Sequence, residues 1–285
     1  MICSENPRWK KVRTILLYHL AALLLLVGLY TIVKPIVVSY KNSQRSIELV
    51  QHVEAKLETM PNEYQSQMIQ TYTHYNQYVL ASLKQEMWHE QDVDYYELPR
   101  IDSNNVIGSI TVPTLGINNL AIYHDDKEKE LSSGVGHVPY TSIPLGNAEE
   151  HAVLAAHSGR EHMTLFSNLE QLACGDTFTI SILGMKHQYK VMDVNIVLPE
   201  ETDVLQQTGE LSLVTLATCY PTGVNTHRLL VTGELVAEVG AEVPAPAKIK
   251  SIVFNDYRWR AYAMLGVLVI ILIHVVFLNR KLYSR

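Results

Sequence analysis

The sequence predicts a mainly β domain, a closed or nearly closed barrel of seven to eight strands, preceded by a helical extension and held between two apolar segments. Three observations lead to this prediction. After Pro99, short β-branched or alternating runs follow one another, separated by Gly, Pro, Asn and Asp. The stretch before Pro99 has helical periodicity. Two long uncharged runs lie near the ends of the 285-residue chain.

Composition excludes several classes of protein. Hydrophobic residues make up 47% of the chain and charged residues 18%, which excludes wholesale disorder. Three cysteines are too few for a disulfide scaffold. The formal net charge of −6 argues against a nucleic-acid partner, because such a partner requires a basic surface.

Two uncharged segments are long enough to cross a membrane. Residues 14–33 form a run of 20 residues, which at about 1.5 Å per residue spans the hydrocarbon core of a bilayer. A signal peptide is the alternative, although its apolar core is normally shorter. Residues 262–278 form the second run, for which a buried core helix is the alternative. We predict a transmembrane helix at each position.

The charges beside these segments predict the topology. Residues 1–13 and 279–285 each carry +3, which leaves −12 for residues 34–261. Positive flanks stay on the cytoplasmic side of a membrane. We therefore predict a two-pass protein of the cell membrane, with both termini cytoplasmic and an acidic exoplasmic domain between the two helices.

Residues 41–105 are predicted to form a helical extension with a possible lid region at its end. Apolar residues recur at three- and four-residue steps in two stripes, and Pro61 separates them. The second stripe is rich in tyrosine and is interpreted as the packing face of a helical hairpin; an aromatic ligand-binding surface is the alternative. The stripes are Ile47, Val50, Val53, Leu57 and Met60, then Tyr64, Met68, Tyr72, Tyr75, Val79, Leu83 and Met87.

Residues 106–237 are predicted to form the barrel, and residues 238–258 a linker to the second span. One short helix is expected over residues 163–172. The charged run at residues 125–130 is expected to be a solvated loop. The predicted strands are 107–112, 120–123, 152–156, 177–182, 189–197, 213–218 and 229–235.

Three side chains at predicted strand ends can perform acyl transfer together. Cys219 ends one strand and Arg228 begins the next, so adjacent antiparallel strands would place them face to face. His157 ends a third strand. A thiol, an imidazole and a guanidinium suffice to attack a carbonyl, protonate a leaving amine and stabilise charge on oxygen. A buried structural cysteine is the alternative, whereas a zinc site lacks a second nearby thiol.

Motifs in this region resemble those of a known family. Thr215–Cys219, read as Thr-Leu-Ala-Thr-Cys, resembles the TLxTC signature of the sortases, the cysteine transpeptidases of Gram-positive cell surfaces. The likeness covers about residues 106–237, in the family's order. The other similar segments are 134–137, 141–144, 155–159, 165–169, 197–202 and 223–231.

The resemblance implies a sortase-like β-barrel and a role for each of the three side chains. Cys219 is the expected nucleophile, His157 the general acid and base, and Arg228 the ligand of the oxyanion or of the substrate carbonyl. No metal or organic cofactor is expected. Near the site, Thr218 is expected either to bind substrate or to complete the strand end. Arg160 and His162 are further candidates for substrate binding.

The two spans and the helical extension resemble the layout of class C sortases, which polymerise pilins. This implies partners with LPxTG-like sorting signals, cut between Thr and Gly and joined to a lysine amine of a pilin subunit. An amine of a cell-wall precursor is the alternative acceptor. The same residues are also compatible with a simple cysteine hydrolase or with a non-catalytic scaffold that docks pilins.

One feature departs from class C. Its members commonly carry an Asp-Pro-aromatic lid motif ahead of the barrel, and this chain contains no Asp-Pro dipeptide. We therefore expect the Cys219 thiol to be open to small alkylating reagents and residues 90–105 to be mobile. Packing of Tyr95, Tyr96 or Leu98 into the cleft is the alternative. Away from the site, Cys174 is expected to be a packed thiol and His227 to be structural.

Overall fold

A computed structural model describes most of the chain, namely residues 7–88, 93–159, 165–201, 209–238 and 266. The chain divides into two compact units, Met1–Val38 with Lys250–Arg285, and Ser39–Ile249. The predicted second span, 262–278, lies outside the described residues except for Gly266. The predicted linker lies outside them beyond Glu238.

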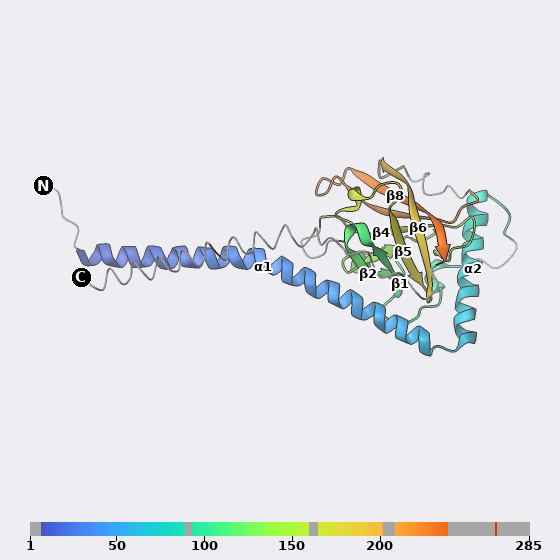
Figure 1. Ribbon diagram of the computed structural model, residues 1–285, viewed down its shortest axis with the longest axis horizontal. Helices are drawn as coiled ribbons and strands as arrows, with labels where there is room; N and C mark the ends of the chain where they lie inside the picture. The colour runs from blue at the N-terminus through green and yellow to red at the C-terminus, as the bar shows by residue number, and fades with distance from the viewer. Residues whose placement is uncertain (1–6, 89–92, 160–164, 202–208, 239–265, 267–285) are drawn as a thin grey trace. The chain divides into compact units, whose positions relative to one another are not determined.

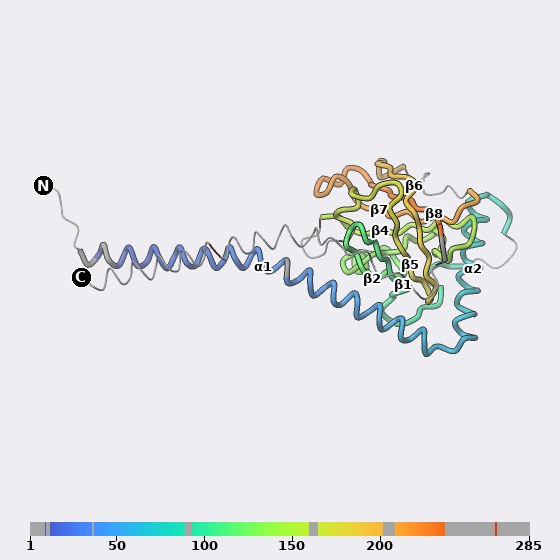
Figure 2. The backbone as a smooth tube through the Cα atoms, in the orientation of Figure 1, coloured from blue at the N-terminus to red at the C-terminus, as the bar shows by residue number. Residues whose placement is uncertain are grey.

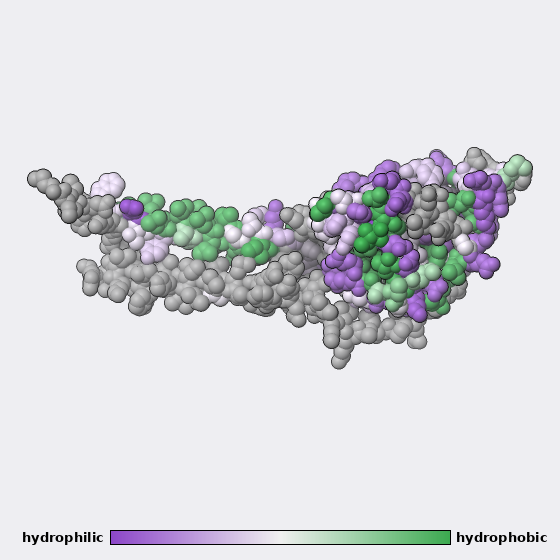
Figure 3. Space-filling view, turned by 90° about the horizontal axis from the view of Figure 1, so that it is seen from above, coloured by the Kyte–Doolittle hydropathy of each residue, from purple (hydrophilic) through white to green (hydrophobic). Residues whose placement is uncertain are grey.

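The first helix, α1 (Pro7–Thr59), runs through the whole of the predicted first span. By length and composition it is the one helix among the described residues that is able to cross a membrane. Large apolar side chains of its N-terminal part, such as Leu16 and Leu24, are mostly exposed. They form the apolar surface along α1 in Figure 3. Such a surface marks this part of α1 as a candidate membrane span.

A second helix, α2 (Asn62–Lys84), follows the predicted break at Pro61 and lies beside the barrel (Figure 1). The interpretation of the tyrosine stripe as a packing face is confirmed for its middle part, whereas Tyr64 and Met87 at its ends are exposed. The first stripe likewise faces the core at three positions. The buried stripe residues are Val50, Val53, Leu57, Met68, Tyr72, Tyr75 and Val79.

Polar contacts fasten α2 to the barrel unit. Tyr72 donates its hydroxyl to the Pro99 carbonyl at 2.8 Å. The buried Asn76 amide donates to the Ile143 carbonyl at 2.8 Å and to Glu150 Oε1 at 2.6 Å. Its Oδ1 accepts the Ile143 N–H at 2.7 Å. Because these groups are buried, each bond left unmade would cost about 1–3 kcal/mol.

The predicted helical extension continues to residue 105, whereas α2 ends at Lys84. Gln85 caps α2 in the left-handed conformation, at φ 56°, and its own N–H and the next one return to carbonyls of the last turn. Such a cap ends a helix. In the described residues that follow, the next helical segment is the short 3-10 helix η1 (Tyr95–Glu97).

Eight strands close a barrel in the order β1-β2-β3-β4-β7-β8-β6-β5, which confirms the predicted barrel. Figures 1 and 2 show where this barrel lies in the chain. The pairs β2–β3 and β4–β7 are parallel, and the others are antiparallel. The strands are β1 (Val106–Val112), β2 (Ile117–Tyr123), β3 (Val135–His137), β4 (His151–Ala155), β5 (Thr177–Ile182), β6 (Met185–Val197), β7 (Leu213–Tyr220) and β8 (His227–Glu238).

The prediction missed β3, because its three residues include Gly136 and His137 and lack an alternating apolar run. Two other predictions need correction. The described part of the predicted helix 163–172 contains only the 3-10 helix η3 (Leu169–Gln171). The predicted solvated loop at 125–130 is wrong, since it contains the helix α3 (Glu128–Leu131) and two buried acidic residues.

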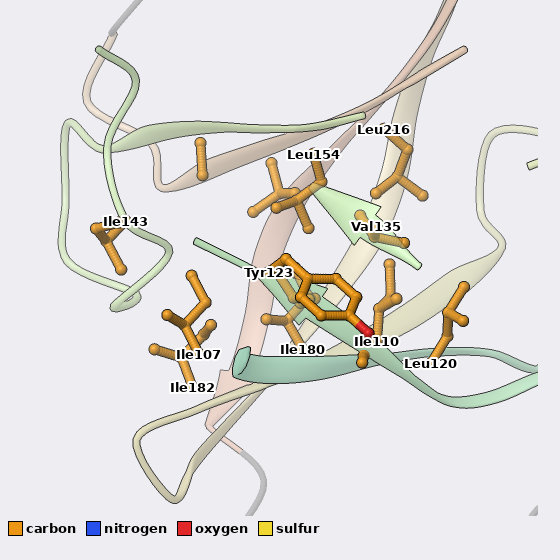
Figure 4. Packing of buried hydrophobic residues seen from close by; sticks show 14 of the residues in the cluster. Ile107, Ile110, Leu120, Tyr123, Val135, Ile143, Leu154, Ile180, Ile182 and Leu216 are labelled. Carbon is orange, nitrogen blue, oxygen red and sulfur yellow. The ribbon is translucent and has the colours of Figure 1, made fainter. Parts of the chain in front are cut away.

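Alternate residues of the strands fill the interior of the barrel (Figure 4). Ile110, Ile180, Leu154 and Leu216 are each fully buried, and burial of one such side chain contributes about 1.5–3 kcal/mol. Successive strand residues point to opposite faces. Because Leu216 points inward, Cys219 belongs to the outward face of β7.

Candidate active site

The parallel pairing of β4 with β7 brings His157 to the level of Cys219. In this ladder Ala155 is the partner of Ala217, and the Ala156 N–H continues it by donating to the Ala217 carbonyl at 3.1 Å. His157 lies two residues after Ala155, and Cys219 lies two residues after Ala217. His157, just after β4, and Cys219, near the end of β7, therefore lie at the same end of two neighbouring strands.

The antiparallel pairing of β7 with β8 places Arg228 opposite Cys219. The two residues are direct partners in the register, next to the pair of Tyr220 and His227. Directly opposite residues share a face, with Cβ atoms about 4.5–5.5 Å apart. The prediction that these residues stand face to face is confirmed. Cys219 and Arg228 are both partly exposed, so a substrate is able to reach them.

Two hydroxyl groups tie the ends of β4 and β7 together. Thr218 donates its hydroxyl to the Ala156 carbonyl at 2.7 Å, and Ser158 donates its hydroxyl to the Cys219 carbonyl at 2.7 Å. These bonds lie on either side of His157 and Cys219, so they restrain the backbone of both. For Thr218, the contact supports the interpretation that it completes the strand end. The sequence carries no separate signal for this contact of Ser158.

His157 contacts a carboxylate that the sequence did not indicate. Its Nε2 lies 3.1 Å from Glu128 Oε2 on α3, and its side chain is 24% exposed. The Phe166 N–H donates to the His157 carbonyl at 3.3 Å. Glu128 belongs to the charged run that was expected to be solvated. Its distance of 29 residues from His157 carries no signal in a single sequence.

A turn between β7 and β8 supports the arginine. The N–H groups of Val224 and Asn225 both donate to the Pro221 carbonyl. Arg228 Nη1 donates to the carbonyls of His227 at 3.0 Å and Asn225 at 3.4 Å. These two bonds hold the guanidinium against the backbone of the turn. Arg228 lies on the same face of the sheet as its partner Cys219.

Three further expectations have different outcomes. Arg160 and His162 lie outside the described residues, so their placement beside His157 stays a prediction. Cys174 was expected to be packed, which is wrong: it is exposed, and its Sγ lies 3.3 Å from the Met192 carbonyl. His227 Nδ1 lies 2.9 Å from the Thr226 hydroxyl, in keeping with a structural role.

The segment before the barrel is anchored by an aromatic stack. The buried ring of Tyr95 stacks on His124 and His137, with centroids 4.2 and 5.5 Å apart, and its hydroxyl lies 3.0 Å from His137 Nδ1. Leu98 and Ile101 are buried as well. The expectation of a mobile segment without apolar anchors is therefore wrong for residues 93–105. Residues 89–92 lie outside the described residues.

Burial controls the protonation of the two stacked histidines. Desolvation lowers the pKa of His124 and of His137 to about 4, so both rings are neutral at pH 7. His137 Nε2 lies 2.8 Å from the Ser142 carbonyl. Among the described residues, neither ring nitrogen of His124 has a hydrogen-bond partner, and no group of three or more His, Cys, Asp or Glu is placed to hold a metal ion.

Known proteins of one family are similar to this chain. Residues 110–236 match the family model of the sortase domain. The chain is 27% identical to sortase A of Bacillus anthracis over 221 residues, which cover 77% of this chain and 95% of that protein.

Solved structures of sortase C are similar as well. The crystal structure of sortase C1 from Streptococcus agalactiae is 33% identical, with a TM-score of 0.61, and the match covers 67% of this chain and all of that one. The structure of Clostridium perfringens sortase C with the C-terminal cell wall sorting motif is also 33% identical, with a TM-score of 0.59, over 67% of this chain and 99% of that one. The chain therefore belongs to the sortase family of cysteine transpeptidases, and its neighbours among solved structures are class C enzymes.

Proposed function

We propose that this transpeptidase cleaves LPxTG-like sorting signals and joins the acyl group to a lysine amine of a pilin subunit, and so assembles pili. The class of its structural neighbours supports the proposal. So does the neighbour from Clostridium perfringens, whose structure was determined with a cell wall sorting motif. The helical extension that precedes the barrel resembles the layout of class C.

In this proposal Cys219 is the nucleophile, His157 the general acid and base, and Arg228 the oxyanion ligand. The observation that carries these roles is the register, which pairs Cys219 with Arg228 and brings His157 to the same level through β4. Both backbone contacts of the guanidinium use Nη1. In this proposal Nη2 and Nε supply the donors to the substrate oxygen.

The proposed reaction has two steps, acylation of Cys219 and transfer of the acyl group to an amine. The Cys219 thiolate attacks the Thr carbonyl carbon of the sorting signal, the Thr–Gly bond breaks, and His157 gives its proton to the departing Gly amine. Arg228 stabilises the charge that develops on the carbonyl oxygen. A lysine amine, deprotonated by His157, then attacks the thioester carbon, and the C–S bond breaks to regenerate the thiolate.

The proposal includes anchoring in the cell membrane. The apolar surface of α1 over residues 14–33 supports the first span. The second span at residues 262–278 is supported by its uncharged sequence and by the positive flank that follows. In this arrangement both termini are cytoplasmic, and the barrel lies on the exoplasmic side, where pilins and the cell wall are found.

A second candidate acceptor is an amine of a cell-wall precursor. The likeness to sortase A of Bacillus anthracis over most of both chains favours this candidate. The barrel, the three side chains and the thioester would be the same in both reactions. The two candidates differ only in the amine that resolves the thioester.

One experiment separates these candidates. Full-length protein in detergent is mixed with purified candidate pilins and, separately, with a peptide amine that mimics a cell-wall precursor. Mass spectrometry then identifies the products. A ladder of pilins joined by isopeptide bonds supports pilus assembly. Exclusive transfer to the peptide amine supports cell-wall anchoring, release of free acid only indicates a hydrolase, and no cleavage with any partner indicates a docking scaffold.

A further inference from the structure

The contact between Glu128 and His157 has a direct chemical consequence. Glu128 Oε2 lies 3.1 Å from His157 Nε2. An ionised carboxylate only accepts hydrogen bonds, whereas a neutral imidazole has one nitrogen that donates and one that accepts. The contact therefore assigns the N–H to Nε2 and the lone pair to Nδ1. The hydrogen bond at one ring nitrogen thus determines the chemistry of the other.

We propose that Glu128 is a positioning residue for transpeptidation, which holds His157 through Nε2–H so that Nδ1 exchanges the proton. This inference rests on the proposed role of His157. Nδ1 takes the proton of the Cys219 thiol, gives it to the departing Gly amine, and later takes a proton from the incoming amine. In this proposal Glu128 acts through His157 and not on the reacting atoms.

The carboxylate is 68% exposed, but the helix that carries it is fixed at both ends. At the N-terminal end, Lys127 forms an ion pair with the buried Asp125 at 2.5 Å, and its Nζ lies 4.6 Å from the centre of the Tyr96 ring. At the other end, Asn105 Nδ2 donates to the buried Glu130 Oε1 at 3.4 Å. The contacts with Tyr96 and Asn105 hold α3 on the segment from η1 to the start of β1.

The contacts that hold α3 explain why the exposed Glu128 is able to orient the imidazole of His157. An isolated surface ion pair contributes little, because two long side chains must be ordered for one contact. Here the backbone of Glu128 is already fixed, and His157 follows directly on the β4–β7 ladder. Only the side-chain torsions of Glu128 remain to be ordered, so the contact costs less conformational entropy than a pair on two mobile elements.

The test compares Glu128→Ala with Glu128→Gln in the full-length protein in detergent, using a quenched LPETG peptide with a small amine acceptor. Alanine removes the acceptor of the Nε2–H bond, and we expect kcat to fall about three- to tenfold with KM unchanged. Glutamine retains an acceptor oxygen, so we expect it to keep kcat within about twofold of the wild type. Lys129→Gln on the same helix, whose side chain is 86% exposed, is the matched control and should leave kcat unchanged.

Three kinetic results would overturn the proposal. These are a wild-type kcat in Glu128→Ala, a kcat of Glu128→Gln as low as that of Glu128→Ala, and a change confined to KM. The first excludes any role in turnover, the second a role through hydrogen bonding, and the third a role in orienting the imidazole. His157→Ala separates this inference from the proposed function: appreciable turnover in that variant would remove the catalytic role of His157 itself.

A second measurement does not depend on turnover. Nitrogen-15 NMR of the histidine rings distinguishes the two neutral tautomers, and the His157→Ala variant identifies the resonances of His157. We expect neutral His157 to carry its proton on Nε2 in the wild type and to populate both tautomers in Glu128→Ala. A neutral ring protonated mainly on Nδ1 in the wild type would contradict the proposal.

Discussion

Two regions of this protein hold functional side chains by different means. At the end of the β4–β7–β8 sheet, the backbone ladder places Cys219, His157 and Arg228. Around α3, side-chain contacts of Lys127 and Glu130 connect the helix that carries Glu128 to its surroundings, including Tyr96 and Asn105. The ladder fixes position through many hydrogen bonds, whereas the α3 region depends on a few individual pairs. Changes in the two regions should therefore have effects of different size.

The largest effect is expected from Cys219→Ala. This variant should lose both cleavage and joining, because the substitution removes the sulfur that forms the thioester. The fold should be intact, since the side chain lies on the outward face of β7 and is partly exposed. Activity is measured with an LPETG peptide, and circular dichroism serves as the control for folding. Turnover above background in a folded variant would remove Cys219 from the nucleophile role.

The next effect is expected from Arg228→Lys. Lysine keeps the charge but lacks the planar fork of donors, and the loss of an oxyanion donor typically lowers kcat about 10²–10³-fold. His227→Gln, the neighbour that points to the opposite face, is the matched control and should retain activity. Near-normal turnover in Arg228→Lys would show that the arginine acts only through its charge or its packing.

The aromatic stack predicts a dependence of stability on pH. His124 and His137 have a pKa of about 4 in the folded protein, against an ordinary value of 6.5. Between these values the unfolded chain binds more protons than the folded one, so stability should fall as the pH decreases from 6.5 to about 4. Replacement by phenylalanine in His124→Phe removes one of the two groups. The decrease in Tm over this range should then be smaller than in the wild type.

Thermal unfolding of the wild type and of His124→Phe, followed by circular dichroism across this pH range, checks the prediction. A wild-type Tm that is constant from pH 6.5 to 4 would contradict the burial of the two rings. An equal pH dependence in the wild type and in His124→Phe would show that His124 does not contribute.

The smallest effect is expected at Thr218. Thr218→Val keeps the shape of the side chain but leaves the Ala156 carbonyl without its donor, at a cost of about 1–3 kcal/mol in the free energy of unfolding. Thr218→Ser retains the hydroxyl and should lose less stability. Chemical denaturation measures both variants. A loss of activity in Thr218→Val at unchanged stability would favour the alternative role in substrate binding.

Features that depend on local sequence patterns were predictable, and the strand ladder at Cys219 is one of them. Alternation of apolar residues specifies which face of a strand is buried, and a short connection joins β7 to β8, so the opposition of Cys219 and Arg228 followed from the pattern. The β4–β7 pair is parallel and distant in sequence. The strand pattern marks His157 as a candidate at a strand end, and the resemblance to sortases adds the expectation that it acts with Cys219.

The region around α3 was not predictable in this way. Asp125 and Glu130 belong to a run of charges that is typical of a solvated loop, yet both are buried because Lys127 and Asn105 supply partners. Tyr95 belongs to a polar stretch, and its burial depends on His124 and His137, which are distant in sequence. Contacts of this kind depend on tertiary structure, and neither periodicity nor composition indicates them.

The central claim is that this sortase forms its thioester on Cys219, and trapping of that intermediate tests it most directly. Full-length protein in detergent is mixed with an LPETG peptide without an added amine, quenched in acid and digested for mass spectrometry. We predict that the fragment containing Cys219 gains the mass of the peptide acylated through threonine, and that Cys219→Ala gains none. Acylation of Cys174 instead, or release of product with no adduct on either cysteine, would contradict the account.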